Sequence, residues 1–147
     1  MNGSSAQPGV TAADLANLPA SVVAHGVDLT PVDRIARLLE AHGERFTRRV
    51  FTPSEIAFCA AAPRRPAERY AARFAAKEAA LKALGTGLSH GIRWTDIAVE
   101  RLPSGAPELH LAGRAAEIAA ERRISRLLVS LSHAGGLAFA SVIAVRD

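Results

Sequence analysis

The stretch RFAAKEAALKALGTG, residues 73–87, is the most informative part of the sequence. Before Gly85 it is rich in Ala and free of Gly and Pro, which predicts a helix that ends where Gly85 stands. Apolar residues recur along it almost without a gap, so the helix should be largely buried. It nevertheless carries four charged side chains: Arg73, Lys77, Glu78 and Lys82. Charges in a buried helix need compensating groups, so the stretch is expected to line a site.

The two lysines of this helix are unusual for the chain. Eighteen residues are Lys or Arg, yet Lys stands only at positions 77 and 82. Nucleotide composition can explain a surplus of Arg over Lys, but not why both lysines lie in one helix. Because a compact ammonium and a planar guanidinium are not interchangeable, both positions are candidates for a specific role.

Length and composition limit the chain to one domain. Its 147 residues, 49% of them hydrophobic, can bury one core but not two. We expect a tail over residues 1–20 and a single domain over residues 21–147. The lone cysteine, Cys59, excludes an intrachain disulfide and fits a reducing compartment. Without a secretion signal or a membrane-spanning apolar run, the protein is expected to be cytoplasmic, with no membrane partner.

Local patterns predict an α+β fold. A β-branched run at residues 21–29 predicts a buried strand. Three helices should follow: one from the cap Thr30 and the first-turn Pro31 to just before Gly43, one from the cap Thr52 toward Pro63, and one over residues 66–84. Later patterns predict strands at 96–102 and 108–111, a helix at 113–122, and a hairpin of strands 126–133 and 137–145. This order indicates a mainly antiparallel sheet packed against helices.

The best candidates for chemistry are two carboxylates and one lysine. Asp28 ends the first strand, and Glu78 lies in the long helix, so the pair can hold Mg²⁺, which uses one or two carboxylates together with substrate phosphates. Lys82, one turn after Glu78, can neutralise phosphate oxygen. Each residue also has a structural alternative: Asp28 as a cap or turn carboxylate, and Glu78 as an ion pair with Lys82. His133, before a glycine turn, is a structural or a site residue.

The charge of the chain points to an acidic partner. The net charge is +4 and the pI about 10.2, with arginines clustered at residues 34–49 and 64–73. Nucleic acid, a polyphosphate ligand and an acidic protein all fit this pattern. Single-strand binding usually adds stacking aromatic residues, and these are only 5% of the chain. A nucleic-acid partner is therefore not expected.

Taken together, three motifs resemble the holo-[acyl-carrier-protein] synthases, the small type of 4′-phosphopantetheinyl transferase. They are GVDL with VDRI at residues 26–35, FTPSE at residues 51–55, and RFAAKEA through KALGTG at residues 73–87. The closing VSLSH at residues 129–133 also fits. The likeness begins near residue 22 and keeps the order and spacing of the family.

The resemblance implies a transferase with a Mg²⁺ cofactor. Such enzymes move 4′-phosphopantetheine from coenzyme A to a serine of apo acyl carrier protein in lipid synthesis, releasing adenosine 3′,5′-bisphosphate. By likeness, Asp28 and Glu78 hold the metal and act with Lys82 as the catalytic group. The residues implied to bind coenzyme A are Arg73, Lys82, Gly85, Thr86, Gly87 and His133. The serine proton could pass to Glu78 or to a water on the metal.

The resemblance also implies partners. Arg34 and Arg37 should face the acidic helix of the carrier protein, and the family forms homotrimers with sites at subunit interfaces. Thr30-Pro31 departs from a more common hydrophobic-acidic pair, which leaves the choice of carrier and pathway open. Two other hypotheses are open: a nucleic-acid-binding module, motivated by the charge, and an inactive trimeric scaffold. Lys77 is expected to contact the ligand or to pair across the trimer interface.

Overall fold

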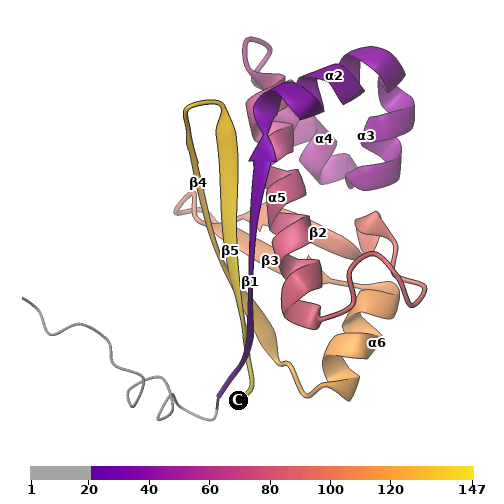
Figure 1. Cartoon of the computed structure of the whole chain (residues 1–147), viewed down its shortest axis with the longest axis vertical. Coiled ribbons are helices and arrows are strands. Elements are labelled where there is room, and N and C mark those ends of the chain that lie inside the picture. The colour runs from indigo at the N-terminus through magenta and orange to yellow at the C-terminus, as the bar shows by residue number, and fades with distance from the viewer. Residues whose placement is uncertain (1–20) are drawn as a thin grey trace, which may run out of the picture.

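The computed structural model describes residues 21–147; the predicted tail, residues 1–20, lies outside them. Figure 1 labels the elements along the chain. They are β1 (Val22–Pro31), α2 (Val32–His42), α3 (Glu44–Val50), α4 (Pro53–Ala60), α5 (Pro66–Leu84), the 3₁₀ turn η1 (Trp94–Asp96), β2 (Ile97–Arg101), β3 (Pro107–Leu111), α6 (Gly113–Glu121), β4 (Arg126–Ala134) and β5 (Leu137–Val145).

The strands form two antiparallel sheets. The larger has the order β1-β5-β4, and the smaller pairs β2 with β3. The hairpin predicted around the glycine turn is the β4–β5 pair, in which Ala134 lies opposite Leu137. The α+β prediction, with antiparallel strands and covering helices, is confirmed.

Helix α5 is the centre of the fold. It packs on one face of the larger sheet, against β1 and β5 (Figure 1), and ends at Gly85, whose φ of 75° is left-handed as a helix-terminating glycine allows. Close approach depends on Gly26 of β1, where a Cβ would overlap the carbonyl oxygen of Ala79. This contact brings the strand residue Asp28 beside the middle of α5.

The region between β1 and α5 differs from the prediction in two places. Thr30 is not a helix cap: it is a buried residue of β1, and α2 begins at Val32 after Pro31 with no side-chain cap. The strand continues because Pro31 still lies opposite Leu137 of β5. No sequence pattern predicts helix α3, because its seven residues include four charged side chains and show no clear apolar periodicity. The cap of α4 is confirmed, with Thr52 and Glu55 forming a reciprocal capping box.

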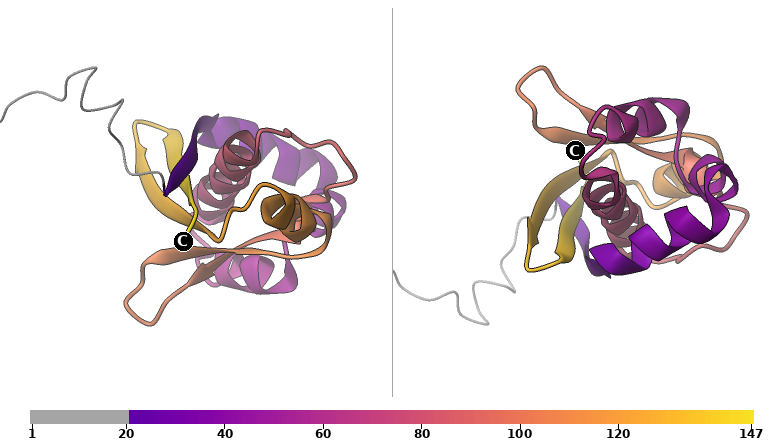
Figure 2. Two further views of the ribbon diagram at one scale, coloured as in Figure 1. Left: turned by 90° about the horizontal axis from the view of Figure 1, so that it is seen from below. Right: turned by 90° about the horizontal axis from the view of Figure 1, so that it is seen from above.

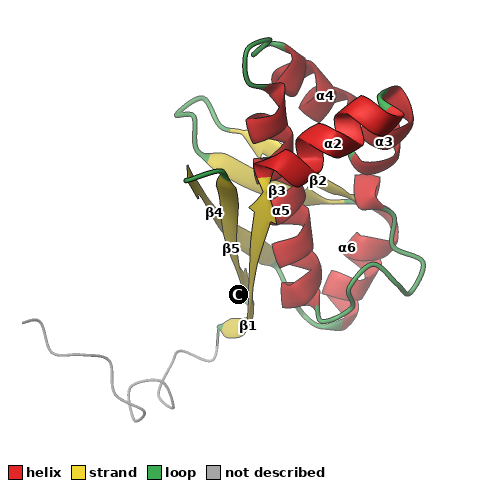
Figure 3. Cartoon of the chain, turned by 45° about the horizontal axis from the view of Figure 1, so that its top comes forward, coloured by secondary structure: helices red, strands yellow, loops and turns green. Residues whose placement is uncertain are grey.

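The helices lie on one side of the larger sheet (Figures 2 and 3). Within residues 21–147, no helix covers its other face, which we call the outer face. Large apolar side chains are exposed there: Val27, Leu29, Leu128, Leu137 and Phe139. No helix in the described part of the chain has the length and apolar character needed to cross a membrane.

Candidate active site

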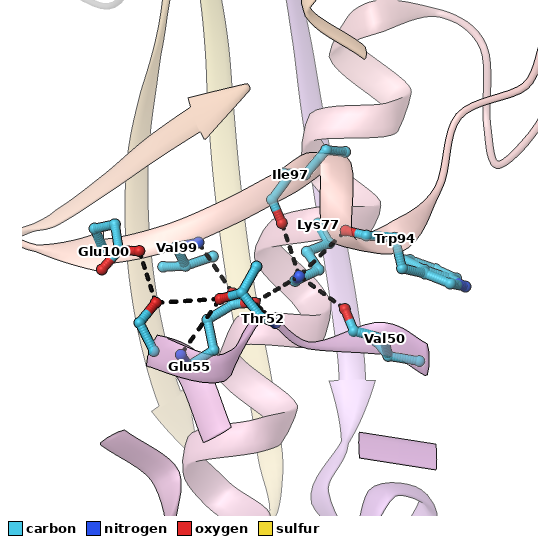
Figure 4. Close-up of polar contacts among 9 residues, drawn as sticks. Val50, Thr52, Glu55, Lys77, Trp94, Ile97, Val99 and Glu100 are labelled. Carbon is cyan, nitrogen blue, oxygen red and sulfur yellow. Dashed lines mark hydrogen bonds and ion pairs between the residues drawn. The ribbon is translucent and has the colours of Figure 1, made fainter. Parts of the chain in front are cut away.

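Lys77 does not belong to a ligand site. Its side chain is fully buried and its ammonium donates to the Glu55 carboxylate at 2.7 Å. It also donates to three backbone carbonyls: those of Val50, Trp94 and Ile97 (Figure 4). Glu55 accepts in turn from the backbone N–H of Thr52 and of Val99. The prediction that Lys77 contacts a ligand or a second subunit is wrong, because its neighbours in the same chain already satisfy it.

Lys82 lies on a different side of the same helix and has a different environment. Its side chain is 53% exposed, and its ammonium lies 3.2 Å from Asp28 Oδ1. It also donates to the carbonyl oxygen of Val27 at 2.9 Å. The other oxygen of Asp28 accepts from the hydroxyl of Thr30 at 2.7 Å. Asp28 of β1 and Lys82 of α5, two residues nominated for one site, are therefore in direct contact in the structure.

Glu78 completes this group. Burial raises the pKa of its carboxyl, and the negative charge of Asp28 raises it further, while Lys82 and Arg34 oppose the shift. Glu78 thus lies close enough to Asp28 for the two charges to repel each other. No ion pair joins Glu78 to Lys82 within residues 21–147, because Lys82 pairs with Asp28 instead.

A divalent cation suits these two carboxylates. Mg²⁺ takes oxygen ligands, keeps several waters and is commonly held by one or two carboxylates plus substrate phosphates. Two repelling carboxylates, one of them with a raised pKa, favour a cation between them. No group of three or more metal-ligating side chains occurs in the described residues. Asp28 and Glu78 are the two neighbouring carboxylates that could hold such an ion, and the ammonium of Lys82 lies 3.2 Å from Asp28 Oδ1.

The turn after α5 has one unsatisfied polar group. Gly85 and Gly87 have φ values of 75° and 58°, which glycine adopts more readily than any other residue. Between them, the Thr86 hydroxyl is buried without a hydrogen-bond partner in the protein. Such a hydroxyl is unusual and is satisfied by a bound water or by a ligand.

Arg73 and His133 lie elsewhere, in a cavity of about 850 Å³. The cavity is strongly basic: five arginines line it, at positions 64, 65, 69, 73 and 101, against one acidic residue, Glu68. Three of the guanidinium groups surround the ring of Phe58, with Arg73 at 3.8 Å, Arg69 at 4.1 Å and Arg101 at 5.0 Å from the ring centroid. Such a cavity is complementary to a polyanion.

Arg73 is a buried arginine with an unpaired hydrogen-bond donor. It is only 5% exposed, and its Nε has no hydrogen-bond partner. Burial lowers its pKa from the ordinary value, opposed by Cys59 and Glu55, although an arginine keeps its charge at any physiological pH. Arg73 Nε and Thr86 Oγ1 are the two buried side-chain atoms without a partner in residues 21–147. Both belong to residues predicted to bind coenzyme A.

The predicted site residues therefore fall into two groups. Asp28 lies on β1 and His133 on β4, the two outer strands of the sheet order β1-β5-β4. The carboxylate group and the basic cavity thus lie at opposite edges of one sheet. Sequence patterns do not single out Arg69 and Arg101 for this cavity: Arg69 belongs only to the second arginine cluster, at residues 64–73, and Arg101 comes from a distant strand.

Comparison with known proteins identifies the class. A sequence model of the 4′-phosphopantetheinyl transferase superfamily matches residues 24–139. A holo-[acyl-carrier-protein] synthase of Methylobacterium radiotolerans is 55% identical over 126 residues, covering 83% of this chain and 92% of that relative. The fold and these matches define a phosphopantetheinyl transferase.

Solved structures give the same result. The holo-[acyl-carrier-protein] synthase of Neisseria meningitidis has a TM-score of 0.76 and 34% identity, covering 84% of this chain and 98% of that chain. The Helicobacter pylori enzyme, solved with coenzyme A, has a TM-score of 0.72 and 31% identity, covering 82% and 98%. The chain belongs to the holo-[acyl-carrier-protein] synthase family, which confirms the resemblance found in its sequence.

Proposed function

We propose that this chain transfers the 4′-phosphopantetheine group of coenzyme A to a serine hydroxyl of apo acyl carrier protein. The observation that carries the proposal is the cluster of Asp28, Glu78 and Lys82, which brings two carboxylates and an ammonium together between β1 and α5. The turn that follows α5 adds the unpartnered hydroxyl of Thr86. The family to which the chain belongs supports it.

We propose Mg²⁺ as the cofactor, held by Asp28 and Glu78. When bound, the ion would neutralise charge on the pyrophosphate. Lys82, anchored by Asp28 and by the carbonyl of Val27, is placed to approach a phosphate oxygen. Phosphoryl transfer depends chiefly on positioning and charge stabilisation, so these fixed groups can perform it.

The bond changes follow from this arrangement. The serine oxygen forms a bond to the phosphorus that carries phosphopantetheine, and the bond from that phosphorus to the bridging oxygen breaks. Adenosine 3′,5′-bisphosphate leaves with that oxygen, and the serine proton is released. Glu78, which lies near Asp28 and Lys82, is one candidate acceptor for this proton.

The basic cavity supplies the second half of the coenzyme A site. Coenzyme A carries a 3′-phosphate besides its pyrophosphate, and a cavity with Arg64, Arg65, Arg69, Arg73 and Arg101 suits such a polyanion. The unpartnered Nε of Arg73 and the ring of His133 would contact the ligand there. The turn at residues 85–87 would contact it near Lys82.

We propose a homotrimer with each site between two chains. Two observations support this: the carboxylate group and the basic cavity lie at opposite edges of the sheet, and the outer face exposes five large apolar side chains. A cyclic, head-to-tail arrangement brings opposite edges of neighbouring chains together and buries such faces. The family resemblance implies the number three.

The carrier protein should dock on α2. Arg34 and Arg37 are both exposed on this helix, and Arg34 lies close enough to lower the pKa of Glu78. An acidic partner bound at these arginines would deliver its serine near the carboxylates.

A cytoplasmic location stays a prediction from the lone cysteine. Cys59 itself is a buried core residue, and burial raises the pKa of its thiol to about 12.

The transfer reaction itself tests the proposed function. The full chain is incubated with coenzyme A, Mg²⁺ and several apo carrier proteins, and the carriers are weighed by intact-protein mass spectrometry. We expect the mass of one phosphopantetheine group to appear on the carrier serine and to require Mg²⁺. No transfer to any carrier, with the fold intact by circular dichroism, would contradict the proposal.

A further inference from the structure

Thr30 is not among the residues of the proposed reaction, but it is buried and hydrogen-bonded to one of them. It is 1% exposed in the layer between β1 and α5. It lies two residues after Asp28, so both side chains point to the same face of the strand, toward α5. Its hydroxyl donates to Asp28 Oδ2 at 2.7 Å.

This hydrogen bond divides the two oxygens of Asp28 between two donors. Thr30 holds Oδ2, while Lys82 holds Oδ1 at 3.2 Å. A carboxylate has about four lone-pair directions, so each oxygen keeps capacity for a further ligand. Without the hydroxyl, the carboxylate could rotate and give both oxygens to Lys82, which would then compete with a cation.

We propose that Thr30 is a positioning residue, which orients the carboxylate of Asp28 toward a divalent cation and away from full pairing with Lys82. The inference rests on the proposed metal site and adds a residue of this chain to it. Groups that hydrogen-bond a metal ligand fix its orientation, and their loss commonly weakens metal binding by about 10–100-fold.

Thr30→Val and Thr30→Ser separate the hydroxyl from the shape of the side chain. Val keeps the size and removes the donor, whereas Ser keeps the donor. Mn²⁺ binding to the full chain is measured from the electron paramagnetic resonance signal of the free ion. We expect Thr30→Val to bind Mn²⁺ about 10–100-fold more weakly than the parent, and Thr30→Ser to bind within about 3-fold of it.

Two further readouts separate positioning from a merely structural role. In the transfer assay, Thr30→Val should need correspondingly more Mg²⁺, and saturating Mg²⁺ should restore its rate. Thermal unfolding reports whether each variant folds. If Thr30→Val does not fold, Thr30→Ala and Thr30→Ser are compared instead, because both lack the methyl group and only Ser keeps the hydroxyl.

The outcomes distinguish this inference from the proposed function. Equal Mn²⁺ affinity in the parent and Thr30→Val, with binding lost in Asp28→Asn, would overturn the role of Thr30 and leave the metal site standing. Equal Mn²⁺ affinity in the parent and Asp28→Asn would overturn the metal site, and the inference with it. Weak binding in both Thr30→Val and Thr30→Ser would also overturn it, since the hydroxyl would not be the cause.

Discussion

The two lysines of α5 should separate stability from activity. Lys77 and Lys82 stand five residues apart on one helix, yet Lys77 is fully buried and Lys82 is about half exposed. We predict that Lys77→Met destabilises the fold, whereas Lys82→Met leaves the fold intact and removes transfer activity. Each variant is the control for the other, because both replace a lysine of the same helix by an apolar side chain of similar length.

The loss of stability expected for Lys77→Met follows from the partners of this lysine. Replacing it leaves the Glu55 carboxylate, which is 0% exposed, with only the N–H groups of Thr52 and Val99. Breaking a buried ion pair on one side costs about 3–5 kcal/mol. Since domains of this size are stable by only about 5–15 kcal/mol, this is a large fraction of the free energy of unfolding.

The magnitude for Lys82 is much smaller. An ion pair of a half-exposed lysine contributes roughly 0–1 kcal/mol. Its loss should therefore hardly move the unfolding midpoint. The effect on transfer is separate, because a coenzyme A phosphate would lose the Lys82 ammonium beside it.

Urea unfolding followed by circular dichroism measures both effects, with transfer measured on the same samples. Adding Glu55→Gln to Lys77→Met should recover about 1–3 kcal/mol, because the uncompensated charge is gone. A Lys77→Met protein within about 0.5 kcal/mol of the parent would refute the structural role of this lysine. Full transfer activity in Lys82→Met would refute its role in the site.

Three further predictions concern the site and its frame. Glu78→Gln should reduce transfer by about 100-fold or more, since a bound cation contributes several kcal/mol to such reactions. The pKa of Glu78 is raised in the fold, so ionisation of this carboxyl opposes folding at neutral pH. Glu78→Gln should therefore unfold at a higher temperature than the parent at pH 7, and the difference should vanish at pH values below the ordinary pKa of a glutamate. A lower melting temperature of the variant at pH 7 would contradict this. Arg73→Met should raise the Kd for coenzyme A, measured by calorimetry, by roughly 10–100-fold, as expected for lost hydrogen bonds to a charged group; an unchanged Kd would remove Arg73 from the site. Gly26→Ala should lower the free energy of unfolding by roughly 1–3 kcal/mol or more in urea, because its Cβ would overlap the backbone of α5; parental stability would show that β1 does not pack there as described.

Local patterns were enough to predict most elements of the fold. Gly85 ends α5, and Thr52 with Glu55 caps α4, because capping depends on residues three or four apart. Seven-residue α3 lacks such a signal, and strand pairing with β5 outweighed the Thr-Pro helix signal at Thr30.

Some residues of the site could also be predicted from the sequence, whereas their tertiary contacts could not. Asp28, Glu78 and Lys82 could be nominated because carboxylates and lysines in apolar surroundings need a reason to be there, and the structure brings them together. The pairing of Lys77 with Glu55 could not be predicted, since the residues are 22 apart in sequence and meet only through packing of α4 on α5. The separation of Arg73 from Lys82 depends on which sides of α5 face which strands, and therefore on the tertiary fold.

We propose that one chain provides the carboxylates of each transfer site and its neighbour provides the basic cavity. Co-expression of Asp28→Asn with Arg73→Met tests it most directly, with transfer to an apo carrier protein measured by mass spectrometry. At a coenzyme A concentration well below the raised Kd of Arg73→Met, each variant alone should be nearly inactive. In mixed rings, about a quarter of the sites would combine two intact halves, so we predict recovery to roughly a quarter of the parental rate. Mixed assemblies as inactive as the separate variants would contradict a site shared between chains.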